Sequence, residues 1–447
     1  MMARLAAAVA VAVAYLAAAP RVVNGDGLGY VKAALRGTLY PGHLAYVPIL
    51  GVLARVTGAT RPVELVWPAR VLCAIAVAVA AWALGSIARR RHGSDAAAWA
   101  AMLGLAASWG ALSAGSDVES YGPALGALVG ALWCADRGWA VAAGLLGALA
   151  ALLHVENVLF VPVCALVVER PRARVVVLAT AGAVVAAAYA AVLPAHGVAW
   201  LAGASHGLRY PLRATTPFVA VYGACKALVY APYPYEASWA RVLGCFAVGA
   251  AAALGLASCV RRPLGRAAML AWIVPYAIVG VAFFASDAER WTFLLPLGWL
   301  AAAARPRRAL VVAAAIAVAN AIVWLPTAKD GTLRTRAEAA ARHLQPGDVV
   351  VGPGHGWDEY IGFYDRSGAT PFPLVYFAGA VGRAALPGAI ADAARGHRLY
   401  LARFHDDVDP MGWKELRLFG IDRNNARALL PPGHATTIGD GLERWDP

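Results

Sequence analysis

The chain has 447 residues, of which 60% are hydrophobic and 15% charged, and its formal net charge at pH 7 is +13. Soluble domains average about 25% charged residues, so this composition excludes a wholly soluble protein and indicates a polytopic membrane protein with one modest soluble part. The basic residues fall in small clusters between apolar runs, which is typical of positive-inside topology and argues against nucleic-acid binding. Six cysteines lie scattered in apolar surroundings, without the spacing of a zinc site or a disulfide framework.

The first apolar run, residues 3 to 19, ends in three alanines that resemble a signal-peptidase cleavage site. Because many further apolar runs follow, we expect an uncleaved first span. The bias toward Ala, Val, Arg and Gly is typical of a GC-rich coding sequence and suggests a bacterial plasma (inner) membrane protein.

A polar segment, residues 24 to 30, follows this run, and Tyr40-Pro41-Gly42-His43 comes soon after it. A carboxylate (Asp26) just beyond a spanning helix, with glycines and aromatic residues around it, suits a site at the water–lipid boundary. Asp26 could equally cap a short helix from Gly27 to Arg36. Our hypothesis is that Asp26 is a general base, with Tyr30 and His43 as substrate-binding neighbours.

Eleven apolar runs are candidates to cross the bilayer. They lie near residues 3–19, 68–88, 96–114, 120–135, 138–153, 155–168, 174–193, 239–259, 267–285, 291–304 and 309–325. With the N-terminus inside, all the arginine clusters between the spans fall on the cytoplasmic side, and the C-terminus is outside. The apolar stretches 44–57 and 217–231, in the outer loops 20–67 and 194–238, would break this alternation, so we expect them to be interfacial or re-entrant.

Two further acidic residues, Asp117 and Glu119, fall in the next outer turn. They could hold the hydroxyl groups of a sugar or, together with Asp26, a divalent cation, although a helix N-cap explains them equally well. No cofactor is required by the sequence, and a divalent cation is left open.

Other candidate residues are basic or aromatic. His154 interrupts an apolar run, as substrate-binding residues at a membrane edge do, but an interhelical hydrogen bond accounts for it as well. His206 and Arg209 belong to an outer basic and aromatic patch suited to a lipid-linked phosphate, or simply to interfacial anchoring. Arg290, at the outer end of a span, is placed to neutralise a phosphate leaving group.

After Pro326 the composition becomes that of a soluble domain, residues 327–447, which we expect on the extracytoplasmic face. A helix over Arg334 to His343 and strands over 348–351, 373–377 and 398–402 predict a small α/β unit. The glycine-rich turn from Gly352 to Gly356 lacks both the dinucleotide fingerprint and the P-loop lysine, so a structural loop is the better interpretation.

The chain resembles the GT-C superfamily of polytopic glycosyltransferases, in particular the protein O-mannosyltransferase and aminoarabinose-transferase-like group. The resemblance covers about the first 325 residues and rests on the order and sidedness of loose motifs. These are Gly25-Asp26-Gly27-Leu28-Gly29-Tyr30, Tyr40-Pro41-Gly42-His43, Trp67-Pro68-Ala69-Arg70, Asp117 with Glu119, the run Gly144 to His154, and Glu289-Arg290-Trp291-Thr292-Phe293-Leu294-Leu295-Pro296.

The resemblance implies transfer of a sugar from a polyprenyl-phosphate donor to a lipid, glycan or protein acceptor on the outer face, usually with inversion. The family's first-loop acid corresponds to Asp26 and its late basic residue to Arg290. The sequence departs from the family where Gly27 follows Asp26, where Tyr40-Pro41-Gly42-His43 replaces a His-Pro-Pro run, and where His154 replaces a lysine.

Two other functions stay open. A transporter or flippase of lipid-linked glycans would carry ionisable residues at mid-span, whereas the charges here lie at the ends of the apolar runs. A non-catalytic membrane protein of envelope assembly would keep the fold without chemistry at Asp26.

Overall fold

The computed structural model describes residues 2–23, 25–197, 216–231, 238–284, 287–354, 360, 368–402, 413 and 416–446. The chain divides into two compact units, Met1–Thr327 and Ala328–Pro447. The first unit is helical, and the second contains a β-sheet.

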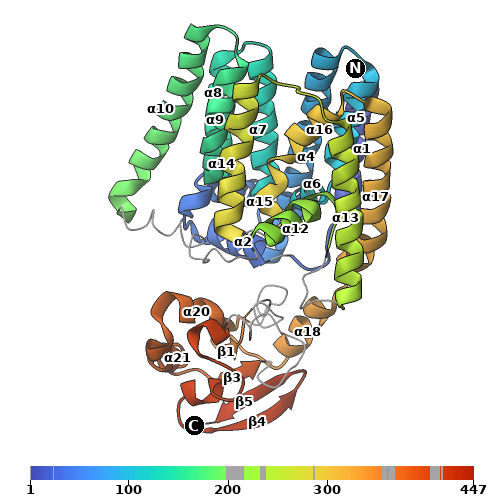
Figure 1. The fold of residues 1–447 in the computed structure, drawn as a ribbon. Coiled ribbons are helices and arrows are strands. Elements are labelled where there is room, and N and C mark those ends of the chain that lie inside the picture. Colours follow the sequence, from blue (N-terminus) through green and yellow to red (C-terminus); the bar gives the residue numbers. More distant parts are fainter. Residues whose placement is uncertain are drawn as a thin grey trace. The chain divides into compact units, whose positions relative to one another are not determined.

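The first unit is a bundle of helices joined mostly by short turns (Figure 1). Its helices are α1 (Met2–Ala17), α2 (Gly25–Arg36), η1 (Pro41–His43), α3 (Tyr46–Thr57), α4 (Pro62–His92), α5 (Asp95–Ala107), α6 (Trp109–Ser116), α7 (Tyr121–Asp136), α8 (Ala140–Leu153), η2 (Val155–Phe160), α9 (Val161–Val167), α10 (Pro171–His196), α12 (Thr216–Leu228), α13 (Trp239–Cys259), α14 (Arg266–Phe284), α15 (Glu289–Thr292), α16 (Leu295–Ala302) and α17 (Pro306–Ala328).

Each of the eleven predicted apolar runs coincides with one helix or with two helices in tandem. Among the described residues, four helical segments are long and apolar enough to cross a membrane alone: α4, α10, α13 and the segment that begins with α17. The pair α5 and α6, bent by 64°, makes a fifth. The chain is therefore a multi-pass membrane protein, and the count of eleven spans stays a prediction. The stretch 217–231 overlaps α12, whose 13 residues would extend over only roughly 20 Å.

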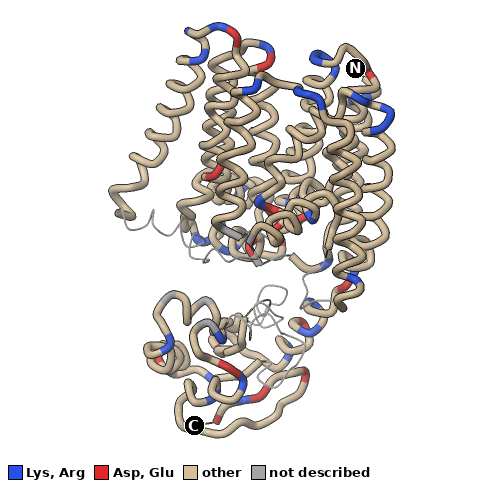
Figure 2. The backbone as a smooth tube through the Cα atoms, viewed as in Figure 1, with Lys and Arg blue, Asp and Glu red and all other residues tan. Residues whose placement is uncertain are grey.

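Basic residues gather at one end of this bundle, where α4 ends and α5 begins (Figure 2). Three of them form ion pairs between helices: Arg91 and Arg90 lie 2.7 and 3.6 Å from Asp136, and Arg89 lies 3.0 Å from Asp95. The positive-inside rule predicts that this end faces the cytoplasm. The same rule predicts that the opposite end, which carries α2, α12 and α15 in Figure 1, is the outer one.

The bend between α5 and α6 is stabilised by side chains from other helices. Ser108 donates to the carbonyl of Gly104 (2.9 Å) and accepts from the indole nitrogen of Trp299 (2.8 Å). Asn320 donates to the carbonyl of Ala107 at 2.8 Å. The bond from Asn320 gives a partner to a backbone carbonyl next to the break in the helix. The bend directs α6 to the turn that carries Asp117 and Glu119.

The second unit is a five-stranded sheet with helices. Its elements are α18 (Thr332–Ala341), β1 (Val349–Gly352), β2 (Thr370–Pro373), α20 (Leu374–Val381), η4 (Arg383–Ala385), α21 (Leu386–Ala393), β3 (Leu399–Ala402), η5 (Arg417–Phe419), η6 (Ala426–Leu429), β4 (His434–Gly439) and β5 (Leu442–Asp446). The strand order is β2-β1-β3-β5-β4, with β1 parallel to β2 and β3, and β5 antiparallel to β3 and β4.

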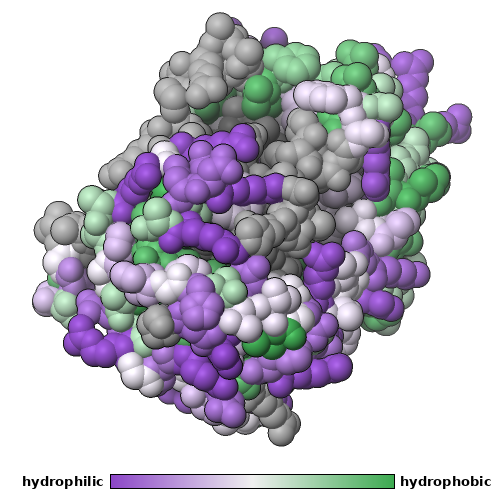
Figure 3. All heavy atoms as spheres, turned by 90° about the horizontal axis from the view of Figure 1, so that it is seen from below, coloured by the Kyte–Doolittle hydropathy of each residue, from purple (hydrophilic) through white to green (hydrophobic). Residues whose placement is uncertain are grey.

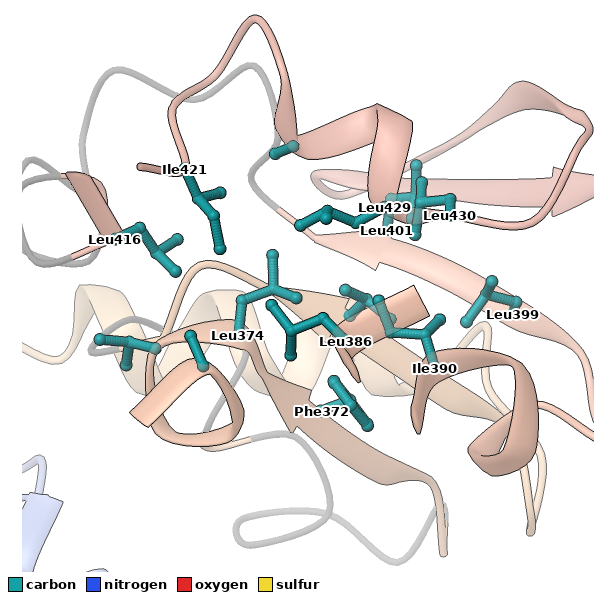
Figure 4. Packing of buried hydrophobic residues seen from close by; sticks show 14 of the residues in the cluster. Phe372, Leu374, Leu386, Ile390, Leu399, Leu401, Leu416, Ile421, Leu429 and Leu430 are labelled. Carbon is teal, nitrogen blue, oxygen red and sulfur yellow. The ribbon is translucent and has the colours of Figure 1, made fainter. Parts of the chain in front are cut away.

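The core of this unit joins the sheet to α20 and α21. Figure 4 shows Phe372 and Leu399 from the strands and Leu374, Leu386 and Ile390 from the helices gathered in one apolar cluster.

Most of the described surface in Figure 3, which views the molecule from below, is hydrophilic.

The predicted helix near 334–343 and the strands near 348–351 and 398–402 are confirmed. The predicted strand over 373–377 is wrong, because β2 ends at Pro373 and α20 begins at the next residue. Leu374, Val375 and Ala378 are buried at a helical spacing, and the apolar content of this short run did not distinguish helix from strand.

Candidate active site

A chain of hydrogen bonds connects three segments of the first unit: α2, η1 and the end of α8. The Tyr30 hydroxyl of α2 lies 3.1 Å from Nε2 of His43, and Nδ1 of His43 lies 3.1 Å from the carbonyl oxygen of Leu153. Because a carbonyl only accepts, Nδ1 carries a proton, and Nε2 of the neutral ring accepts from Tyr30. The first outer loop is thereby fixed to the end of α8.

His154 continues this polar chain into a group of aromatic rings. It is 4% exposed, and its ring centroid lies 4.9 Å from that of His43, 4.4 Å from that of Tyr121 and 5.5 Å from that of Phe293. Within the described part of the chain its Nδ1 has no hydrogen-bond partner and lies 4.0 Å from Oε2 of Glu156. Three predicted site residues, Tyr30, His43 and His154, are thus in one cluster.

Asp117 is part of a buried ion pair with the helix α4. Nη2 and Nε of Arg70 donate to its Oδ1 at 2.9 and 3.3 Å, and the amide of Val118 donates to the same oxygen at 2.9 Å. The side chains of Arg70 and Asp117 are 9% and 8% exposed. This carboxylate therefore joins the α6–α7 turn to α4, and its predicted role in substrate binding stays a prediction.

Glu119, two residues later, has a different environment. It is 1% exposed, and neither carboxylate oxygen has a hydrogen-bond partner among the described residues. Burial raises the pKa of Glu119 well above its usual range, and the nearby charges of Glu289 and Asp26 raise it further. An ionised carboxylate without partners is costly to bury, so Glu119 is a group that needs a proton or a ligand.

Glu289 shares this environment from the other side of the site, at the start of α15. Burial raises its pKa, and the charges of Asp287 and Asp26 act in the same direction, while Arg290 and Lys226 offset part of the effect. Carboxylates of α2, the α6–α7 turn and α15 are thus close enough to influence one another's ionisation.

Asp26 is the accessible member of this group. It lies in the first turn of α2 and is exposed. Tyr30 follows it by four residues, so both side chains lie on the same face of the helix. The side chain of Asp26 is therefore accessible from the surface of the first unit.

Arg290 provides a positive charge at the same end of the bundle. Its Nη1 donates to Oε1 of Glu156 at 2.5 Å, and its Nε lies 3.9 Å from Oδ2 of Asp287. The guanidinium carbon lies 6.0 Å from the centroid of the Tyr121 ring. The Arg290 side chain keeps 22% of its surface exposed, so a ligand can reach it.

The three residues considered for a divalent cation do not form such a site by themselves. Asp117 is bound by Arg70, and among the described residues no three His, Cys, Asp or Glu side chains are grouped so that they could hold a metal ion. The described residues therefore provide no complete set of metal ligands.

His206, Arg209 and Asn24 lie outside the described residues. Glu156 and Glu289 were not among the predicted site residues, although both had a visible signal. Glu156 is a charged residue within an apolar run, and Glu289 directly precedes Arg290 in an outer turn. Their importance comes from contacts between distant segments, which a single sequence does not show.

Solved structures of two proteins share this architecture. ArnT from Cupriavidus metallidurans, bound to undecaprenyl phosphate, matches with a TM-score of 0.60 and 14% identity over 99% of this chain and 97% of that one. Its apo structure gives the same TM-score, with 15% identity. The archaeal oligosaccharyltransferase AglB from Archaeoglobus fulgidus, in complex with an inhibitory peptide and a dolichol-phosphate, matches with a TM-score of 0.50 and 12% identity over 99% of this chain and 74% of that one.

No protein-family model matches the chain, and no curated protein sequence matches it. The similarity is therefore one of structure, and it extends over nearly the whole chain. ArnT and AglB are GT-C membrane glycosyltransferases. This chain has the GT-C fold.

Proposed function

We propose that this protein transfers a sugar from a polyprenyl-phosphate-linked donor to an acceptor on the extracytoplasmic face of the plasma membrane. The observation that carries the proposal is the meeting, at one end of a GT-C bundle, of an accessible carboxylate (Asp26), buried carboxylates and a cation (Arg290). A base and a phosphate-binding cation are the two groups that such a transfer needs.

In the proposed reaction Asp26 is the base. Its carboxylate accepts the proton of an acceptor hydroxyl or amine while the acceptor atom attacks the anomeric carbon. The bond from that carbon to the phosphate oxygen breaks, and its electron pair leaves with the lipid phosphate. Arg290 stabilises the negative charge that develops on this phosphate. A single displacement of this kind inverts the anomeric carbon.

The proposed donor is a membrane lipid, so no soluble nucleotide site is needed. ArnT was solved with undecaprenyl phosphate, and AglB with dolichol-phosphate. Both are polyprenyl-type lipid phosphates, and this shared chemistry supports the same class of donor here. The acceptor can be a lipid, a glycan or a protein.

The test is transfer by the purified full-length protein in lipid nanodiscs, with a panel of polyprenyl-phosphate sugars and acceptors extracted from bacterial envelopes. We expect at least one donor to yield polyprenyl phosphate and a glycosylated acceptor in equal amounts. Nucleotide sugars offered in the same assay are the control and should give no product. If proteoliposomes instead move an intact donor across the membrane without transfer, the protein is a transporter.

The proposed sidedness has its own test. A reporter active only outside the cytoplasm, fused after Pro447, should be active, because an odd number of spans puts the C-terminus outside when the N-terminus is inside. The same reporter fused after Arg137, in a predicted cytoplasmic loop, should be inactive. Activity of the second fusion with silence of the first would reverse the orientation and exclude extracytoplasmic transfer at this site.

A further inference from the structure

We infer that Glu156 is a positioning residue for the donor phosphate: its carboxylate holds the guanidinium of Arg290 in the orientation that receives the phosphate. This inference rests on the proposed function and adds to it a residue that would touch neither sugar nor acceptor. The observation behind it is the ion pair of 2.5 Å between Nη1 of Arg290 and Oε1 of Glu156.

The two partners of this ion pair differ in their access to solvent. The side chain of Glu156 is 5% exposed, whereas that of Arg290 is 22% exposed. Glu156 is thus the inner partner, and the accessible part of the pair belongs to Arg290. A guanidinium carries five N–H donors in a rigid plane, so one guanidinium can contact a carboxylate and a phosphate at the same time.

The backbone that carries Glu156 is itself well fixed. The next residue, Asn157, is fully buried; its Oδ1 accepts from the hydroxyl of Tyr276 at 2.6 Å, and its Nδ2 donates to the carbonyl of Ala150 at 3.3 Å. These bonds connect η2 to α14 and α8. A carboxylate on such a support reduces the freedom that a long arginine side chain must lose when its ligand binds.

The ion pair with Arg290 also stabilises the buried carboxylate of Glu156. Its second oxygen, Oε2, has no hydrogen-bond partner among the described residues. The other carboxylate near the guanidinium, Asp287, lies 3.9 Å from Nε and is more exposed, at 19%. Of these two carboxylates Glu156 is therefore the stronger anchor, and Arg290 loses this ion pair when the charge of Glu156 is removed.

A competing role for Glu156 makes the opposite prediction. If its charge merely opposed the phosphate, its removal would tighten phosphate binding through simple electrostatics. If it positions Arg290, its removal weakens binding. The sign of the change in affinity thus distinguishes the two roles.

The experiment measures binding of undecaprenyl phosphate to the full-length protein in nanodiscs by native mass spectrometry. We expect Glu156→Gln and Arg290→Gln each to weaken binding roughly tenfold. The double variant should bind no more weakly than Arg290→Gln alone, because Glu156 acts through Arg290. Asp287→Asn is the matched control, with an expected change of less than about twofold.

Three results would overturn the inference: unchanged or tighter binding by Glu156→Gln, additive losses in the double variant, or no binding by the wild type. If Glu156→Gln does not fold, Glu156→Asp retains the charge on a shorter side chain and should bind with an intermediate affinity. Binding needs no turnover. If the variants bind the lipid phosphate as expected but the wild type transfers no sugar, the proposed function alone is refuted. If the wild type transfers sugar but the double variant shows additive losses of affinity, the role of Glu156 alone is refuted.

Discussion

Replacing Asp26 by Asn is expected to lower the rate of sugar transfer by about 10²- to 10⁴-fold, the usual contribution of a general base. The amide has nearly the shape of the carboxylate but does not accept the acceptor's proton at neutral pH. Because Asp26 is exposed, the folded state should be little affected. The measurement is single-turnover transfer from the donor identified in the panel, together with the thermal unfolding midpoint of each protein.

Asp117→Asn is the matched control, because it makes the same chemical change at another acid of the outer face. Asp117 is buried against Arg70, so removal of its charge leaves a buried cation without its partner. Loss of one partner from such a pair costs about 3–5 kcal/mol of stability. The two variants should therefore differ in stability, because only Asp117→Asn is expected to lower the unfolding midpoint by the amount that a broken buried ion pair costs. Full turnover by a folded Asp26→Asn protein would exclude Asp26 as the base.

The positions of the helices were largely predictable because apolar runs bounded by charged turns report directly on burial in lipid. The bend within residues 96–114 was not predictable from the sequence, since it depends on Trp299 and Asn320, which come from distant helices. The sequence analysis did not predict the hairpin of β4 and β5, although Asp440-Gly441 is a strong turn signal. Both residues have positive φ, 50° and 79°, as a type I′ hairpin turn requires.

The candidate site was predictable only in part, for a related reason. Polar residues at the ends of apolar runs drew attention to Tyr30, His43, Glu119, His154 and Arg290. Partners cannot be assigned in this way, because Arg70 and Asp117 are 47 positions apart and Glu156 and Arg290 are 134 apart. Only the fold shows that Asp117 belongs to an ion pair, whereas Glu119 has no partner among the described residues.

Replacing Glu119 by Gln is expected to make the ligand-free protein more stable and less active. Burial and the neighbouring charges raise the pKa of Glu119 in the folded protein above its value in the unfolded chain. The folded state therefore loses stability, relative to the unfolded state, as the pH rises above about 4.3, where the unfolded carboxyl ionises. Gln does not titrate. The unfolding midpoint of the variant should thus exceed that of the wild type by a margin that grows between pH 5 and pH 8.

The measurement is the unfolding midpoint of both proteins at pH 5 and pH 8, in EDTA so that added cations do not bind the carboxylates. We expect a gain of roughly 2 °C or more at pH 8 and a smaller one at pH 5. Transfer activity should fall in the same variant, because replacing a residue that function requires at a cost in stability raises stability and lowers activity.

Glu64→Gln is the control, since Glu64 is bound by Arg61 and backbone amides and its removal should lower stability. A lower midpoint for Glu119→Gln at both pH values would mean that the carboxylate has stabilising partners in the folded protein, and that its burial is structural.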